Sequence, residues 1–213
     1  MSKILTKKNL LFIIFGAALL VLFYAFSNLV KEDIFTRFDF DMTIRIQNNV
    51  PKRIDPYLSY FSLLGSFEVT LGILLFLLIL TRKIQSIMII GMFGVMHFVE
   101  IVGKAILFHP GTPFMFHRYS LDIIFPTSYV QPGGSYPSGH AMRAAYLLFL
   151  LIFIIFRTKR LSKTFKLLSY IAISAIFTLM ISSRVSLGEH WTTDVIGGSI
   201  LGLAFALFSF VFI

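Results

Sequence analysis

NLLFIIFGAALLVLFYAFSNLV, residues 9–30, contains no charged side chain along its whole length. About 20 consecutive apolar residues are enough to cross the hydrocarbon core of a bilayer as an α-helix. Lys3, Lys7 and Lys8 precede this run, as basic residues precede the apolar part of a signal peptide. The length of the run and the absence of a small-residue cleavage site instead favour a retained membrane-spanning helix.

Five further apolar runs follow, at 60–80, 84–107, 139–156, 165–183 and 193–213. Of the 213 residues, 57% are hydrophobic and only 14% are charged, whereas roughly a quarter of the residues in a soluble domain are charged. The sequence therefore predicts an all-α integral membrane protein. We expect residues 1–213 to form a single domain of six transmembrane helices packed in a bundle.

The long connection between the first two predicted helices, residues 31–59, begins with a dense group of charged side chains. It continues with Ile44, Ile46 and Val50. This pattern is typical of an amphipathic helix that lies in the membrane interface. A solvated loop is the alternative.

Positive charge is concentrated on alternate connections between the predicted helices. The residues concerned are Lys3, Lys7, Lys8, Arg82, Lys83, Arg157, Lys159, Arg160, Lys163 and Lys166. Cytoplasmic segments carry such an excess of lysine and arginine, so we expect both termini in the cytoplasm. The connections 31–59, 109–138 and 184–192 then face outward.

The composition also excludes several kinds of chemistry. The chain contains no cysteine, so disulfides and thiolate catalysis are excluded, and a zinc site would need His and carboxylate ligands alone. The formal net charge is +9. In a membrane protein such charge mainly reflects topology and contact with anionic headgroups, so we expect bilayer lipids as partners and no nucleic acid.

Polar residues interrupt the apolar chain in three clusters, and the most informative is Ser183-Arg184 followed by His190 and Asp194. If a helix begins after His190, Asp194 lies in its first turn and can accept a hydrogen bond from the His190 ring. Such a bond fixes the imidazole tautomer and leaves the other ring nitrogen free as a nucleophile or base. Arg184 lies across a short turn containing Gly188, within reach of an anion at that nitrogen. The alternative is a His–Asp pair that only satisfies itself near the headgroups.

The second cluster is Pro137-Ser138-Gly139-His140. Ser138 is placed as the N-cap of the following helix. The unpaired backbone amides of a helix start bind oxyanions well. His140, in that first turn, is placed to donate a proton to a departing alkoxide. Taken alone, the cluster is equally compatible with an ordinary capped membrane helix.

The third cluster runs from Lys104 to His109-Pro110. Lys104 either extends to the headgroups or holds a phosphate charge, and the cluster alone does not decide. Glu100 lies one turn before Lys104, with His97 before it. We favour a simple Glu100–Lys104 pair that satisfies two groups that are costly in a membrane.

All three clusters fall at the outer ends of predicted helices, which indicates one assembled site. Two histidines, a carboxylate, two cations and a helix N-terminus suit phosphoryl transfer. One imidazole would attack phosphorus and the other would protonate the leaving oxygen, while the cations and amides neutralise the phosphoryl oxygens.

At these residues the chain resembles the type 2 phosphatidic acid phosphatase family, whose membrane members are six-helix lipid phosphatases. The family pattern is Lys-x6-Arg-Pro, Pro-Ser-Gly-His and Ser-Arg-x5-His-x3-Asp. Its second part is matched in full here, and its third part is matched at Ser183, Arg184, His190 and Asp194.

The resemblance implies a role for each matched residue. His190 would be the nucleophile, Asp194 would orient it, and His140 would be the acid toward the leaving group. The phosphate would be held by Arg184, Ser138 and Gly139, and Lys104 corresponds to the first-motif lysine. The resemblance also implies no metal and no other cofactor.

The first motif departs from the family pattern. Gly111 and Thr112 stand where Arg-Pro is expected, and His109-Pro110 stands where many bacterial members carry an additional Arg-Pro. We therefore include His109 as an additional candidate in the site.

Arg143 is the main candidate to replace the absent arginine. It lies three residues after His140, on about the same face of the helix. His117 and Arg118 in the outer loop are weaker candidates for the same role, because long exposed loops often carry such residues for solvation.

Together these features predict a metal-independent lipid phosphatase that acts through a phosphohistidine at the outer face of a prokaryotic cell (inner) membrane. The expected substrates are a phosphate monoester or pyrophosphate of a membrane lipid: undecaprenyl pyrophosphate, phosphatidic acid or phosphatidylglycerol phosphate. No obligate protein partner is inferred. Two alternatives stay open: a lipid phosphotransferase with the same site, and a catalytically weak lipid-binding or transport protein.

Overall fold

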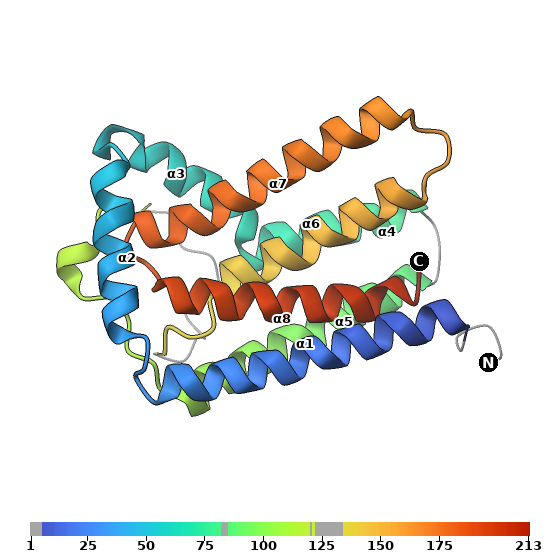
Figure 1. The fold of residues 1–213 in the computed structure, drawn as a ribbon. Coiled ribbons are helices and arrows are strands. Elements are labelled where there is room, and N and C mark those ends of the chain that lie inside the picture. Colours follow the sequence, from blue (N-terminus) through green and yellow to red (C-terminus); the bar gives the residue numbers. More distant parts are fainter. Residues whose placement is uncertain (1–5, 82–84, 120, 122–133) are drawn as a thin grey trace.

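The computed structural model describes residues 6–81, 85–119, 121 and 134–213, and its regular structure there is entirely helical. Five helices are long and apolar enough to cross a membrane: α1 (Lys7–Lys31), α5 (Gln85–Leu107), α6 (Gly139–Arg157), α7 (Lys163–Ser186) and α8 (Thr192–Phe210). They run side by side in a bundle (Figure 1). The predicted all-α bundle is confirmed. Lys3, Arg82 and Lys83, used above for topology, lie outside the described residues.

The span predicted at 60–80 is not one continuous helix. The chain instead forms α3 (Asp55–Ser62), a 3₁₀ turn η2 (Leu63–Gly65) and α4 (Phe67–Thr81), with a bend of 51° between the two parts. Ser66 has extended backbone angles, and its hydroxyl accepts a hydrogen bond from the Val69 amide, so it starts a new helix. Counting this bent pair as one span gives six candidate spans.

The connection between the first two spans is helical rather than a solvated loop. Helix α2 (Thr36–Asn49) lies across the end of the bundle where α1 ends and α8 begins (Figure 1). A short 3₁₀ turn, η1 (Lys52–Ile54), leads from it into α3. Helix α2 buries Asp39 and Thr43 and exposes Phe38, Phe40 and Ile44.

Arg118 attaches the loop that follows α5 to this end of the molecule. Its Nε lies 2.9 Å from Oδ2 of Asp55, and its two terminal nitrogens donate to the backbone carbonyls of Gln47 and Val50 at 3.1 and 3.0 Å. Gln47 in turn donates to the carbonyls of Phe116 and Ser186 at 2.7 and 3.0 Å. The loop, α2, α3 and the end of α7 therefore form one connected cap over the bundle.

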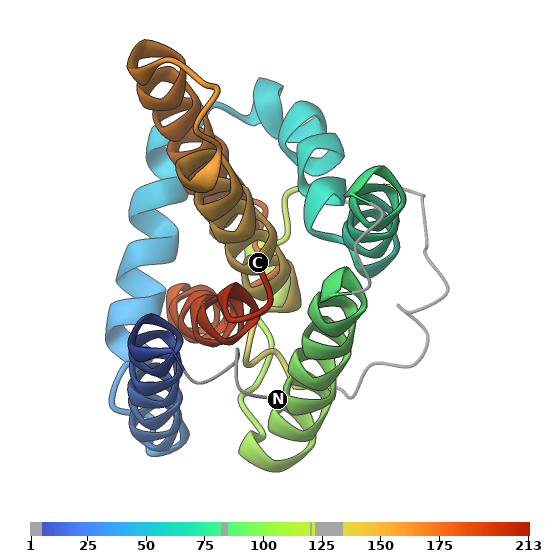
Figure 2. The same cartoon turned by 90° about the vertical axis from the view of Figure 1, so that its right-hand side faces the viewer.

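Helices α6 and α8 form the centre of the bundle, and α1 packs on the far side of α8 (Figure 2). Gly198 and Gly202 allow the close approach of α8, because a Cβ at either position would run into the carbonyl oxygen of Ser138 or Met142 on the α6 side. Small residues four apart are a common basis of tight helix packing in membranes. This packing brings the start of α8 against the start of α6, where two of the predicted clusters lie.

Candidate active site

The start of α8 holds the predicted His–Asp pair. Asp194 is fully buried in the first turn, and its Oδ2 accepts a hydrogen bond from the Trp191 amide at 2.9 Å. The same oxygen lies 3.4 Å from Nδ1 of His190, a loose contact that leaves Nδ1 buried without a well-formed hydrogen bond. Such contacts often tighten only when substrate binds. His190 and Asp194 are therefore neighbours, as the sequence predicts, but the hydrogen bond between them is not fully formed.

Arg184 lies in the last turn of α7 and is 1% exposed. Its Nη1 lies 2.5 Å from Oε2 of Glu189, across a turn in which Gly188 has a φ of +72°. Nε and Nη2 of Arg184 are buried and have no hydrogen-bond partner in the described part of the chain. Buried guanidinium donors without a partner are costly, so this arrangement indicates a place for an anion.

The second predicted cluster forms the start of α6, as expected. The Ser138 side chain caps the helix by accepting from the Ala141 amide at 3.4 Å, and the Ser138 amide donates to the carbonyl of Asp194 at 3.0 Å. The second bond joins the α6 N-terminus directly to the α8 turn that carries the His–Asp pair. His140 follows in the first turn of α6 and is half-buried.

His109 also contacts the His190–Asp194 pair. Its Nδ1 lies 2.8 Å from Oδ1 of Asp194, so the carboxylate contacts two imidazoles, one through each oxygen. The pKa of His109 is raised: burial lowers it, but the hydrogen bond and the charge of Asp194 raise it by more, with a smaller contribution from Asp39. His109 is a candidate from its sequence position, but this contact with Asp194 is not predictable from the sequence.

Lys104 and Arg143 both reach Glu100, which is 1% exposed. Oε1 of Glu100 lies 3.3 Å from Nζ of Lys104, and Oε2 lies 2.9 Å from Nη1 of Arg143 and 2.8 Å from Nδ1 of His97. Nε of Arg143 also donates to the carbonyl of Gly65 at 2.8 Å. The favoured Glu100–Lys104 pair is thus present, as part of a larger buried cluster that includes Arg143.

This cluster lies directly against the start of α6. A Cβ on Gly139 would come within 2.8 Å of Nη1 of Arg143 and would overlap Oε1 of Glu100. The Ser138 amide reaches the Asp194 carbonyl on the other side of Gly139, and Glu100 also holds Lys104. Residues of the three sequence clusters therefore meet at the start of α6.

The side chains of the two loop candidates, His117 and Arg118, have other partners. Arg118 is engaged with Asp55 and the backbone of α2, as described above. His117 contacts the hydroxyl of Thr112 through Nε2 at 3.1 Å. Within the described residues, neither has a contact with Asp194 or Arg184.

Asp39 on α2 is a neighbour of the site that the sequence motifs do not reveal. Its carboxylate accepts hydrogen bonds from the Thr193 amide at 2.8 Å and the Thr193 hydroxyl at 2.5 Å, one residue before Asp194. A single acid on an amphipathic helix gives no signal of such a contact. Among the described residues, no group of three or more His, Asp or Glu side chains is arranged to hold a metal ion.

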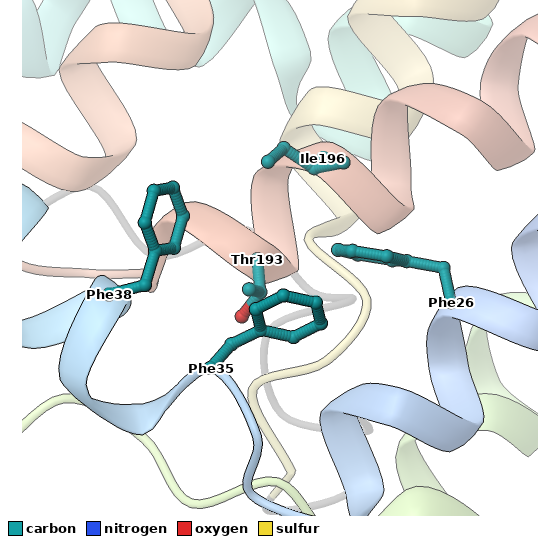
Figure 3. A pocket seen from close by; sticks show the side chains of 5 residues that line it. All are labelled: Phe26, Phe35, Phe38, Thr193 and Ile196. Atoms are coloured by element: carbon teal, nitrogen blue, oxygen red, sulfur yellow. The ribbon is translucent and has the colours of Figure 1, made fainter.

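An apolar cavity of about 380 Å³ lies beside this turn of α8. It is lined by Phe26 from the end of α1, Phe35 and Phe38 from the start of α2, and Thr193 and Ile196 from α8 (Figure 3). Thr193 thus has its hydroxyl on Asp39 and also forms part of the cavity wall. The cavity wall therefore includes the residue directly before Asp194.

Comparison with known proteins assigns the family. Residues 84–213, more than half of the chain, match the family model described as the PAP2 superfamily. The chain belongs to the PAP2 superfamily. The matched region contains the three polar clusters, whereas α2, Gly65 and Phe26 lie outside it.

Similar proteins agree with this assignment. Phosphatidylglycerophosphatase B of Bacillus subtilis (strain 168) is 39% identical over 69 residues, which cover 32% of this chain and 34% of that protein. The match therefore spans about a third of the length of this relative.

Two solved structures have a similar fold. A transmembrane PAP2 type phosphatidylglycerolphosphate phosphatase from Bacillus subtilis has a TM-score of 0.73 at 20% identity, covering 92% of this chain and 93% of that chain. LpxE of Aquifex aeolicus has a TM-score of 0.55 at 20% identity, covering 80% and 93% respectively. With its candidate spans and this fold, the chain is a multi-pass membrane protein.

Proposed function

We propose that this chain is a metal-independent lipid phosphatase that acts through a phosphohistidine on His190. The observation that carries the proposal is the combination of the His190–Asp194 pair with Arg184, whose Nε and Nη2 are buried without a partner in the described residues. A phosphoryl group next to His190 would accept hydrogen bonds from both nitrogens.

The first chemical step would be attack by Nε2 of His190 on phosphorus. Asp194 holds the proton on Nδ1, so Nε2 keeps its lone pair. As the N–P bond forms, the bond from phosphorus to the lipid oxygen breaks, and His140 donates a proton to that oxygen. The lipid leaves as an alcohol, or as a phosphomonoester when the substrate is a pyrophosphate.

The second step would be hydrolysis of the phosphohistidine. His140, now neutral, removes a proton from a water molecule that attacks phosphorus, and the N–P bond breaks to release inorganic phosphate. During both steps the amides at Ser138 and Gly139 and the guanidinium of Arg184 would neutralise the phosphoryl oxygens. Lys104 and Arg143 would add positive charge from behind Gly139, although each is also paired with Glu100.

Two observations support a lipid as the carrier of the phosphate. The site lies at one end of a bundle of membrane-spanning helices, and the apolar cavity beside Thr193 is in the size range of small-molecule sites. A hydrocarbon chain would fit its wall of three phenylalanines and an isoleucine. Because one relative is named phosphatidylglycerophosphatase B, we propose phosphatidylglycerol phosphate as the first substrate to test, with phosphatidic acid and undecaprenyl pyrophosphate beside it.

We further propose that the site faces the outside of a prokaryotic cell membrane, with both termini in the cytoplasm. The exposed basic residues of the α6–α7 connection lie at the end of the bundle away from α2 and the site (Figure 1). Lysine and arginine favour the cytoplasmic side. Six crossings would also place both termini on that side.

The test is phosphate release by the purified protein in detergent, with EDTA present, from each of the three lipids. Wild type and His117→Asn should release phosphate, and His190→Ala should not. Hydrolysis in H₂¹⁸O should place one solvent oxygen in the released phosphate. A phosphotransferase would instead deliver the phosphoryl group to an added alcohol. Saturable lipid binding without phosphate release would overturn the proposal in favour of a binding or transport protein.

A further inference from the structure

The carboxylate of Asp194 is shared unequally between two imidazoles. Nδ1 of His109 lies 2.8 Å from Oδ1, whereas Nδ1 of His190 lies 3.4 Å from Oδ2, the oxygen that also accepts from the Trp191 amide. In the pairing that the proposed function requires, Asp194 serves His190. The structure shows that its better-formed contact goes to His109.

His109 is held in this position by its surroundings. Phe108, the residue before it, has a φ of +44°, a backbone conformation that is unfavourable for a non-glycine residue and turns the chain at the end of α5. The Ser135 amide donates to the His109 carbonyl at 3.0 Å, and the Ser135 hydroxyl lies 3.3 Å from Nδ1. The ring packs edge-on against Tyr136 at 6.3 Å and is 9% exposed.

These contacts join His109 to the two helix starts that carry the site, those of α6 and α8. Ser135 and Tyr136 directly precede Pro137 and the start of α6, and Asp194 lies at the start of α8. Nδ1 of His109 faces a carboxylate oxygen, so the ring must carry a proton on Nδ1 to donate a hydrogen bond. His190 must also carry its proton on Nδ1, because its Nε2 needs a free lone pair to attack phosphorus. Both rings therefore compete for the negative charge of one carboxylate.

We propose that His109 is a positioning residue that acts on His190 through the carboxylate they share. When His109 is neutral, it donates one hydrogen bond and leaves the full charge of Asp194 to orient His190. When His109 is protonated, its positive charge compensates Asp194 and weakens that orientation. The inference rests on the proposed function only in the role given to His190.

The charges around His109 fix the sign of the pH effect. Asp194 faces it from α8, Asp39 from α2 and Asp33 from the turn between α1 and α2, with the neutral Tyr136 phenol on the α6 side. These acids keep His109 protonated to higher pH than an ordinary histidine. As pH rises through the raised pKa of His109, Asp194 is released to His190, so turnover should rise.

The activity test compares His109→Asn with His109→Ala over a range of pH. The asparagine amide nitrogen takes about the place of Nδ1, so it keeps the hydrogen bond to Asp194 and removes the titration. His109→Ala leaves Oδ1 of Asp194 without the hydrogen bond that holds the carboxylate in place. We therefore expect it to lower kcat by about ten- to a hundredfold with little change in KM, the scale on which slight misplacement of a reacting group acts. His109→Asn should keep most of kcat but lose the alkaline rise.

His117→Asn is the matched control, because His117 is a second histidine of the same outer loop and contacts Thr112. It should keep the wild-type pH profile. An alanine variant with wild-type kcat and pH profile would overturn the proposal. So would a rise in KM at constant kcat, which would mean that His109 contacts the substrate directly.

A second measurement does not require activity. The chain contains five histidines, so their ring nitrogens can be followed by NMR in ¹⁵N-histidine-labelled protein in detergent, with each ring assigned by substitution. We expect the nitrogen shifts of His190 to follow the titration of His109 in wild type and to lose that step in His109→Asn. Independence of the two rings would overturn the inference. Coupled rings in a protein that releases no phosphate would overturn the proposed function alone.

Discussion

At the scale of single residues, Glu189 is the ion-pair partner of Arg184, which we propose holds the phosphate. Its carboxylate lies 2.5 Å from Nη1 of Arg184, and its side chain is 37% exposed. It neutralises part of the guanidinium while leaving Nε and Nη2 unpaired within the described residues. A carboxylate so close to the proposed phosphate position should repel an arriving phosphate.

Glu189→Gln should therefore strengthen substrate binding. The amide oxygen still accepts a hydrogen bond from Arg184, but the negative charge is gone. We expect KM to fall by roughly two- to fivefold with kcat nearly unchanged, and the effect to shrink at high salt because the side chain is partly exposed. Steady-state kinetics at two ionic strengths would measure this. Glu32→Gln, an exposed acid at the end of α1, is the control. A higher KM in Glu189→Gln would show that the carboxylate helps to hold Arg184 in place.

At the scale of helices, the close contact between α6 and α8 holds the site together. Gly202 of α8 faces the carbonyl of Met142, whereas a Cβ on Gly94 of α5 would meet no atom within 4 Å. The same substitution should thus have opposite effects at the two positions. Gly202→Ala should destabilise the protein by about 1–3 kcal/mol through overpacking. Gly94→Ala should be neutral or stabilise it by up to about 1 kcal/mol, because alanine restricts the unfolded chain. Thermal unfolding in detergent distinguishes the two, and equal melting temperatures would contradict the packing argument.

Helix α2 docks on the start of α8 through Asp39, and this contact should depend on pH. Burial raises the pKa of Asp39, although its hydrogen bonds from Thr193 partly oppose the shift. The folded protein thus binds the proton on Asp39 more tightly than the unfolded chain does. The stability that this proton contributes is present at low pH and is lost as pH rises through the raised pKa.

Asp39→Asn removes this titration while keeping a similar shape. Its melting temperature relative to wild type should therefore increase between about pH 4, near the ordinary pKa of aspartate, and pH 7. Asp41→Asn, an exposed residue of the same helix, should show no such trend. A constant difference between Asp39→Asn and wild type across this range would contradict the assigned shift.

At the scale of the whole molecule, the site and the basic connection between α6 and α7 lie at opposite ends of the bundle (Figure 1). Because the chain contains no cysteine, single cysteines can be labelled without background. Asn48→Cys near the site should react with an impermeant maleimide in intact cells. Lys159→Cys should react only after the membrane is disrupted. Both side chains are exposed, so access depends on the side of the membrane alone. The reverse pattern would place the site in the cytoplasm.

The sequence was sufficient to predict an all-helical membrane protein of the PAP2 superfamily. Long apolar runs predict membrane helices because the hydrocarbon core offers backbone N–H and C=O groups no hydrogen-bond partner. In a helix these groups pair with one another. The motifs at Ser138–His140 and Arg184–Asp194 predict their own local geometry because their residues lie within one or two helical turns. The break at Ser66 was missed because an apolar run does not reveal where its helix bends.

Only the tertiary structure decided which side chains meet across helices. Asp194 meets His109 from 85 residues away, and Thr193 meets Asp39 from 154 residues away. Arg143, predicted from its helix face to serve the phosphate, is joined to Glu100 of α5. Local sequence determines periodicity and caps, because these depend on residues within a few positions. The partners of a buried charge depend on how helices pack, and that is decided by the close contact of α8 with α6 and by the position of α2 over the site.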